Sequence, residues 1–148
     1  MIGLGSDHRG VELKKRIKIL LNGLKYEYQD YGTDSDERVD YPHFAAQVAE
    51  AVTKRECEKG ILICGTGIGM SIAANKVPGI RAALCYSVET AKAAREHINA
   101  NILVMGADHI NPSLVDEMVR VFLITEALEG RYAQRVEMIT HLEKRQKR

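Results

Sequence analysis

The sequence is poor in aromatic residues and in cysteine, and both shortages narrow the possibilities. It contains no tryptophan and only two phenylalanines among 148 residues. Its three cysteines, Cys57, Cys64 and Cys85, lie far apart and form no C-x-x-C pair. This spacing argues against a disulfide framework or a zinc knuckle, and it fits a reducing, cytoplasmic compartment.

Excess charge and long apolar runs are also missing. The net charge is +1, so no global field favours nucleic acid or an anionic membrane. A basic cluster at 144–148 is expected to be a solvated helix end. No apolar run approaches the roughly 20 residues of a membrane helix, and the first residues lead directly into a charged segment, unlike a signal peptide. We expect one domain, 1–148, with a full hydrophobic core.

Short apolar runs alternate with amphipathic segments along the chain. Leu13, Ile17, Leu20 and Leu24 recur at helical spacing, for example. This alternation predicts the α/β class, as a three-layer α/β/α sandwich around a five-stranded parallel sheet. The expected strands are 1–6, 25–31, 60–64, 80–85 and 101–106, and the expected helices are 10–24, 42–54, about 71–78, 87–97, 112–128 and 131–144.

The segment 60–70 carries the strongest chemical signal. A buried strand ends at Cys64, and three glycines at alternate positions separate it from a helix start. Such a turn lets amide N–H groups converge on an anion, and the helix dipole adds positive potential. Cys64 is either a small buried hydrophobe or a thiolate that acts as base or nucleophile. The glycine spacing fits no dinucleotide or P-loop motif. Met70 stands where a phosphatase thiol loop needs arginine, which leaves an anion site for a small substrate.

Ligands bind at the carboxyl ends of parallel strands, and this rule predicts that Ser6-Asp7-His8, Cys64–Gly69 and the segment before Asp108 share one edge of the sheet. Other polar residues are candidates by their own pattern. Asp7 and His8 follow the first strand, where Asp7 could cap a helix or both could hold sugar hydroxyls or phosphate. His97 ends a helix, where an imidazolium is also a common structural device. Arg131 and Arg135 share a helix face and are either solvated or a fork for a phosphate dianion.

Taken in chain order, these motifs resemble one family, the type B ribose-5-phosphate isomerases and the galactose-6-phosphate isomerase subunits. The resemblance covers essentially the whole chain. It implies a Rossmann-like domain, a homodimer or tetramer with active sites shared across the interface, and no metal or organic cofactor. The segments that carry it are Ser6-Asp7-His8, Asp40-Tyr41-Pro42, Cys64–Gly69, Ser71–Lys76, Gly79–Ala82, Arg95–His97, Asn99–Asn101 and the Arg131/Arg135 pair.

The family's chemistry is aldose–ketose isomerisation of a sugar phosphate through an enediolate. By this resemblance, Cys64 is the base, Thr66 relays a proton between oxygens, and His97 with Asp7 opens the sugar ring. Loop amides hold the enediolate oxygen, and residues 97–101 come from the partner subunit. The other substrate or phosphate contacts that it implies are His8, Tyr41, Gly65, Gly67, Ile68, Gly69, Arg131 and Arg135.

Three positions depart from the family pattern at the polar end of the expected pocket. Ile98 stands where asparagine is usual, Asp108 where arginine is usual, and Tyr132 where histidine is usual. The leading expectation is interconversion of ribose 5-phosphate and ribulose 5-phosphate. A six-carbon substrate (allose or galactose 6-phosphate) and a non-catalytic sugar-phosphate sensor stay open as alternatives. A dinucleotide-dependent oxidoreductase fits poorly, because Glu89, near the required spacing, lies in the opening turn of a helix.

Overall fold

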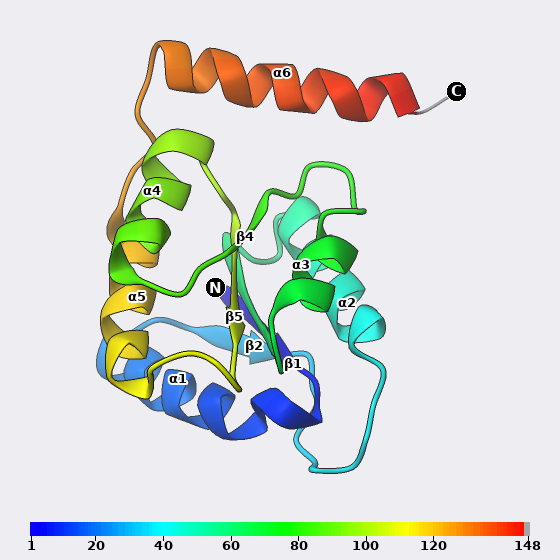
Figure 1. The fold of residues 1–148 in the computed structure, drawn as a ribbon, viewed down its shortest axis with the longest axis vertical. Coiled ribbons are helices and arrows are strands. Elements are labelled where there is room, and N and C mark those ends of the chain that lie inside the picture. Colours follow the sequence, from blue (N-terminus) through cyan, green and yellow to red (C-terminus); the bar gives the residue numbers. More distant parts are fainter. Residues whose placement is uncertain (147–148) are drawn as a thin grey trace.

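Five parallel strands form one sheet in the order β2-β1-β3-β5-β4 in a computed structural model that describes residues 1–146. The predicted α/β class with a five-stranded parallel sheet is therefore confirmed (Figure 1). The strands are β1 (Ile2–Ser6), β2 (Tyr28–Asp30), β3 (Lys59–Cys64), β4 (Ala82–Leu84) and β5 (Ile102–Gly106). The helices are α1 (Val11–Gly23), α2 (Tyr41–Thr53), α3 (Ile68–Ala74), α4 (Val88–Ile98), α5 (Pro112–Ile124) and α6 (Arg131–Gln146), with a short 3-10 turn, η1 (His8–Gly10).

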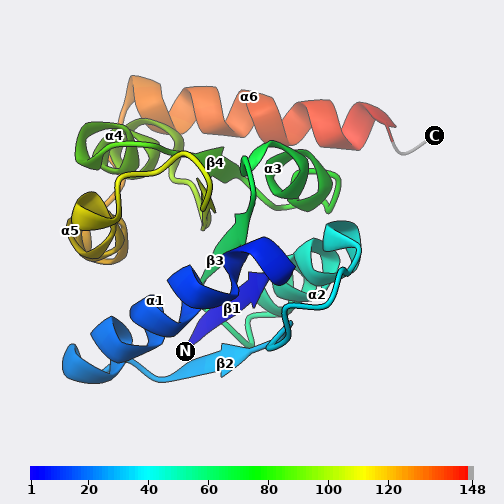
Figure 2. The ribbon, with the colours of Figure 1, turned by 60° about the horizontal axis from the view of Figure 1, so that its bottom comes forward.

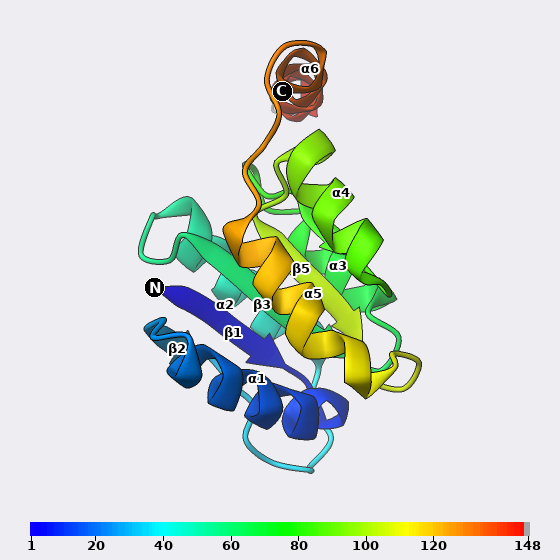
Figure 3. The same ribbon diagram turned by 90° about the vertical axis from the view of Figure 1, so that its left-hand side faces the viewer.

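Two apolar layers cover the sheet, because consecutive side chains of a strand point to opposite faces. Ile61 and Ile63 pack with α1, α4 and α5, which Figure 3 shows in front of the strands. Leu62 and Cys64 pack with α2 and α3 on the other face, as Figure 2 also shows. Helix α6 lies outside this sandwich, across the end of α4 (Figure 1). Lys147 and Arg148, the end of the basic cluster, fall outside the described residues.

The second strand is shorter than predicted, at Tyr28–Asp30 in place of 25–31. Lys25 has a φ of 62°, and the Tyr26 amide donates to the Leu21 carbonyl at 2.9 Å. These residues complete the carboxyl end of α1, so they are not available to the sheet. The fourth strand is also shorter, Ala82–Leu84 in place of 80–85.

Helix α5 ends at Ile124, four residues before the predicted end. The Thr125 carbonyl accepts a hydrogen bond from Nε of Arg95 at 3.0 Å. The Leu128 amide donates to the Glu96 carbonyl at 3.0 Å. Contacts with α4 therefore hold this segment out of the helix, which local helix propensity could not reveal.

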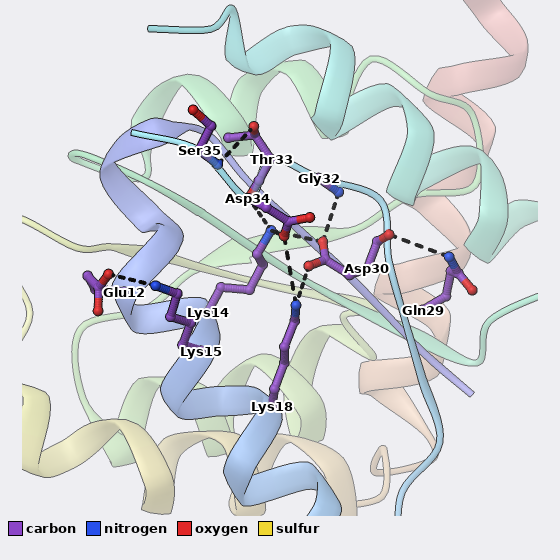
Figure 4. Close-up of polar contacts among 10 residues, drawn as sticks. All are labelled: Glu12, Lys14, Lys15, Lys18, Gln29, Asp30, Gly32, Thr33, Asp34 and Ser35. Atoms are coloured by element: carbon purple, nitrogen blue, oxygen red, sulfur yellow. Dashed lines mark hydrogen bonds and ion pairs between the residues drawn. The ribbon is translucent and has the colours of Figure 1, made fainter. Parts of the chain in front are cut away.

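A buried lysine ties α1 to the segment that follows β2 (Figure 4). The Lys14 side chain is 1% exposed, and its Nζ lies 2.8 Å from Oδ1 of Asp30 and 2.5 Å from the Thr33 carbonyl. Nζ of Lys18 lies 2.5 Å from Oδ2 of Asp30. Because an unpaired buried charge is costly, this cluster fixes the start of the loop that leads to α2.

We expect Asp30→Asn to lower the free energy of unfolding by about 3 kcal/mol at pH 7, because the buried Lys14 ammonium loses its anion. Burial raises the pKa of Asp30, but hydrogen bonds from Lys14, Lys18 and the Gly32 amide outweigh it and leave this pKa below its ordinary value. A carboxyl group whose pKa is lower in the folded protein than in the unfolded chain stabilises the fold at pH values above the unfolded pKa. This stabilisation is lost as pH falls through the folded pKa. The hydrogen bond to Asp30 raises the pKa of Lys18. The stability that Lys18 contributes is therefore lost as pH rises through its folded pKa.

Urea unfolding of wild type and variant from pH 2.5 to pH 7 measures this difference, which should shrink toward the acid end. Asp34→Asn is the matched control. Asp34 is 82% exposed and lies 3.7 Å from Lys14 Nζ, so its loss should stay below about 1 kcal/mol. Equal losses for the two variants would contradict the anchoring role of Asp30.

Candidate active site

The Cys64 thiol lies at the carboxyl end of β3, beneath the glycine loop. Its Sγ accepts a hydrogen bond from the Gly67 amide at 3.2 Å, and the residue is 4% exposed. Gly67 has a φ of 83°, which glycine adopts without strain. The Ile68 amide donates to Oγ1 of Thr66 at 3.1 Å. An N–H donor directed at the sulfur stabilises negative charge there, as a base requires.

Cys85 follows β4 much as Cys64 ends β3, but its thiol has a different hydrogen-bond partner. Its Sγ donates to the Ala83 carbonyl at 3.7 Å, so it acts as a thiol. Burial raises the pKa of Cys85, an effect that the hydrogen bond with Thr90 opposes. Of these two strand-end cysteines, only Cys64 receives an amide hydrogen bond in the described structure.

The glycine loop lies where the strand order reverses. From β1 the chain passes to β2 on one side and then to β3 on the other, so the switch falls between β1 and β3. Open parallel sheets bind ligands at the carboxyl ends of strands at such a point. The turn after β1 carries Asp7 and His8, and these residues thus share the predicted edge with the Cys64 loop.

Asp7 and His8 both hold backbone groups of this edge. Asp7 is 5% exposed, and its carboxylate accepts from the Arg9 amide at 3.0 Å. Nδ1 of His8 accepts from the Val39 amide at 3.3 Å. A neutral His8 ring therefore carries its proton on Nε2, which can donate to a ligand.

Two tyrosines contact the loop. A Cβ on Gly69 would lie 2.6 Å from Cε2 and 2.7 Å from Oη of Tyr41, so glycine is what admits this ring. The Tyr86 hydroxyl donates to the Thr66 carbonyl. Tyr41 was among the contacts predicted from the sequence, and Tyr86 was not, because no motif marks it.

An ion pair between Arg9 and Asp108 crosses the edge next to Cys64. A Cβ on Gly65 would lie 2.8 Å from Oδ2 of Asp108 and 3.0 Å from Cδ of Arg9. From the sequence, Asp108 was only a departure from the family pattern, and Arg9 was not predicted. The sequence signal that could have revealed this ion pair is the presence of opposite charges in the turns after two strands of one parallel sheet.

His97, Arg131 and Arg135 do not join Cys64 in a single chain. Cys64 pairs in register with Gly106, the last residue of β5. His97 lies at the end of α4, a few residues before the first residue of β5, and so at the opposite end of that strand. Four residue steps of strand amount to about 13 Å. The His97 ring stacks on Tyr132 with centroids 4.8 Å apart. Arg131 and Arg135 are exposed on α6, and Nη2 of Arg131 donates to the Tyr132 hydroxyl at 3.2 Å. The predicted phosphate fork is therefore absent from the Cys64 edge of one chain.

Within residues 1–146, no three His, Cys, Asp or Glu side chains group closely enough to hold a metal ion. In the same part of the chain, no helix has the length and apolarity to span a membrane.

The fold and this edge define an α/β protein with a buried thiol at the switch in its strand order. The model of the ribose/galactose isomerase family matches residues 2–139. The chain belongs to this family and is an isomerase.

Three relatives show the extent of the similarity. Ribose-5-phosphate isomerase B of Escherichia coli is 46% identical over 144 residues, which are 97% of each chain. D-erythrulose-4-phosphate isomerase of Pectobacterium atrosepticum is 39% identical over 147 residues, 99% of this chain and 97% of its own. The structure of Clostridium thermocellum ribose-5-phosphate isomerase B superposes with a TM-score of 0.95 at 50% identity and covers 97% of each chain.

Proposed function

We propose that this chain is a sugar-phosphate isomerase that interconverts ribose 5-phosphate and ribulose 5-phosphate. The observation that carries the proposal is the Gly67 amide directed at Sγ of Cys64, 3.2 Å away, at the strand-order switch. Membership of the ribose/galactose isomerase family supports the substrate class. The E. coli and C. thermocellum relatives, both named ribose-5-phosphate isomerase B, support the five-carbon sugar.

The chemistry is a proton transfer between two neighbouring carbons. The Cys64 thiolate removes the proton from carbon 2 of the open-chain aldose, and the electron pair of that C–H bond forms the enediolate double bond. The thiol formed in this way exchanges its proton with solvent while the enediolate persists, and it then delivers a proton to carbon 1, which gives the ketose and regenerates the thiolate. Oγ1 of Thr66 accepts a hydrogen bond from the Ile68 amide, so the Thr66 hydroxyl can still donate its own hydrogen. This hydroxyl relays a proton between oxygens 1 and 2 of the substrate.

The developing oxygen charge falls next to backbone amides. The Gly67 amide is engaged by the sulfur and the Ile68 amide by Thr66. The Gly69 amide lies in the first turn of α3, where N–H groups have no carbonyl partner within their own helix. Such a fixed donor stabilises an enediolate oxygen more strongly than the ground-state carbonyl. The Tyr41 ring lies directly against Gly69, beside this amide.

A second copy of the chain supplies the remaining groups. His97, Arg131 and Arg135 lie at the other end of the sheet from Cys64, so one chain contains two incomplete halves of a site. In a homodimer, His97 of one copy opens the sugar ring with Asp7 of the other. Arg131 and Arg135 then bind the phosphate together with His8.

An exposed apolar surface supports this dimer. It includes edge strand β4 and a hollow of about 320 Å³ beside α6, and monomeric proteins seldom expose such surfaces. The exposed apolar side chains on this surface and along α3 and α6 are Ile68, Ile72, Ile98, Met138, Ile139 and Leu142. We also propose a cytoplasmic location, because Cys57, Cys64 and Cys85 are all free thiols.

The substrate is tested by turnover of matched sugar phosphates. We expect kcat/KM for ribose 5-phosphate to exceed that for allose or galactose 6-phosphate by at least about tenfold, since one carbon shifts the phosphate relative to the base. Erythrulose 4-phosphate belongs in the same series, because a four-carbon isomerase is 39% identical to this chain. A higher value for a four- or six-carbon substrate would replace the five-carbon assignment.

The same samples distinguish an enzyme from a sensor. An enediolate mechanism exchanges the carbon-bound proton with deuterium from heavy water. Calorimetric binding of all the sugar phosphates without deuterium incorporation into any of them would identify a sensor and overturn the isomerase proposal.

A further inference from the structure

The Arg9–Asp108 ion pair lies directly over the residue that follows the thiol. Nη1 of Arg9 contacts Oδ2 of Asp108, and the two side chains come from the turns after β1 and β5. These strands flank β3, so the pair spans the end of the strand that carries Cys64. The Asp108 amide also donates to the Gly65 carbonyl at 2.9 Å, which fixes the carboxylate's turn to the loop.

The Arg9–Asp108 pair is not needed to hold α1 against α5. Arg16, further along α1, already pairs with Asp116 of α5 at 3.1 Å. The side chains of Arg9 and Asp108 are 57% and 37% exposed, and ion pairs in such positions contribute little to stability. The position of the Arg9 pair over Gly65 is therefore the feature that distinguishes it from the Arg16 pair.

Arg9 brings positive charge to the Cys64 edge of the sheet, where the same chain places neither of the two predicted phosphate-binding arginines. Arg131 and Arg135 lie at the opposite end of the same chain. A guanidinium has five N–H donors, and the contact with Asp108 engages Nη1 only. His8, the residue before it in the same turn, keeps Nε2 available because Nδ1 accepts a hydrogen bond from the Val39 amide. Consecutive residues of the turn after β1 therefore supply two donor side chains, and such donors suit a phosphate dianion.

We propose that Arg9, held in place by Asp108, binds the substrate phosphate and so helps to set which sugar phosphates are accepted. This inference rests on the proposed sugar-phosphate isomerase function. The guanidinium contributes charge and donors, and the carboxylate orients it over the Cys64 loop. Once Arg9 is removed, Asp108 is an unpaired anion at the same edge and repels the phosphate.

The test measures KM and kcat for ribose 5-phosphate and the inhibition constant of inorganic phosphate. Arg9→Ala should raise KM and the phosphate inhibition constant at least about tenfold, the scale of a lost charge-assisted hydrogen bond, with kcat changed less than about threefold. Adding Asp108→Ala should recover part of this loss, because the unpaired anion is removed as well. Calorimetric titration with inorganic phosphate repeats the comparison without turnover.

Arg16→Ala is the matched control, since it breaks an exposed Arg–Asp pair between α1 and α5, the helices that follow the two turns carrying Arg9 and Asp108. It should leave KM and phosphate affinity within about twofold of wild type. Unchanged KM and phosphate affinity in Arg9→Ala would overturn the inference while leaving the isomerase function intact. An equal effect of Arg16→Ala would place the phosphate in the hollow of about 290 Å³ that both arginines line, and this would also overturn it. Wild-type protein that binds phosphate but turns over no sugar phosphate would refute the proposed function alone, and wild-type protein that binds no phosphate would refute the inference.

Discussion

Cys64→Ala should lower kcat for the isomerisation by about a thousandfold or more and leave phosphate binding close to wild type. General-base catalysis contributes about a hundredfold to ten-thousandfold, and no second base acts at these carbons in the proposed mechanism. The fold should survive, because alanine keeps the β-carbon inside the same apolar layer. Steady-state kinetics and calorimetry with inorganic phosphate measure the two effects separately.

Cys85→Ala is the matched control for this substitution. It removes another buried thiol at a strand end, but one that donates to the Ala83 carbonyl and accepts no amide hydrogen bond in the described structure. Its kcat should stay within about threefold of wild type, because a buried protonated thiol is a packing group. Full activity of Cys64→Ala, or equal losses in both variants, would exclude Cys64 as the base.

Mixing two inactive variants should restore activity if the site is shared between copies. Cys64→Ala and His97→Asn are each expected to be inactive, since one lacks the base and the other lacks the ring-opening group. In a heterodimer, one site receives both substitutions and the other receives neither. Random exchange in a two-fold dimer makes half of the dimers mixed, so about a quarter of wild-type activity should return.

The measurement is activity after the two variants are co-expressed or reassembled from dilute urea. Mixing each variant with inactive protein of its own kind controls for refolding. If Cys64 and His97 served the same site within one chain, every mixed dimer would carry two damaged sites, and the mixture would stay inactive. That result would contradict the shared site and leave the role of Cys64 to the single-variant test.

Short-range patterns were enough for the central strands and the thiol loop. The apolar run at β3 and the alternating glycines after Cys64 specify a buried strand and a tight turn through side-chain volume and backbone freedom. The ends of β2 and α5 could not be predicted this way. Lys25 takes part in the carboxyl end of α1, and the Thr125 carbonyl binds Arg95 thirty residues earlier. Contacts of this kind override local propensity.

The sequence by itself determined the α/β class, the carboxyl-edge position of Cys64 with Asp7 and His8, and the resemblance to an isomerase family. Periodicity, glycine conformation and the direction of parallel strands act over a few residues and so can be read directly from the chain. Only the tertiary structure decided that Arg9 meets Asp108 over Gly65, and that His97, Arg131 and Arg135 lie at the opposite end of the sheet. Both depend on strand order and register, which arise from pairing between segments far apart in sequence.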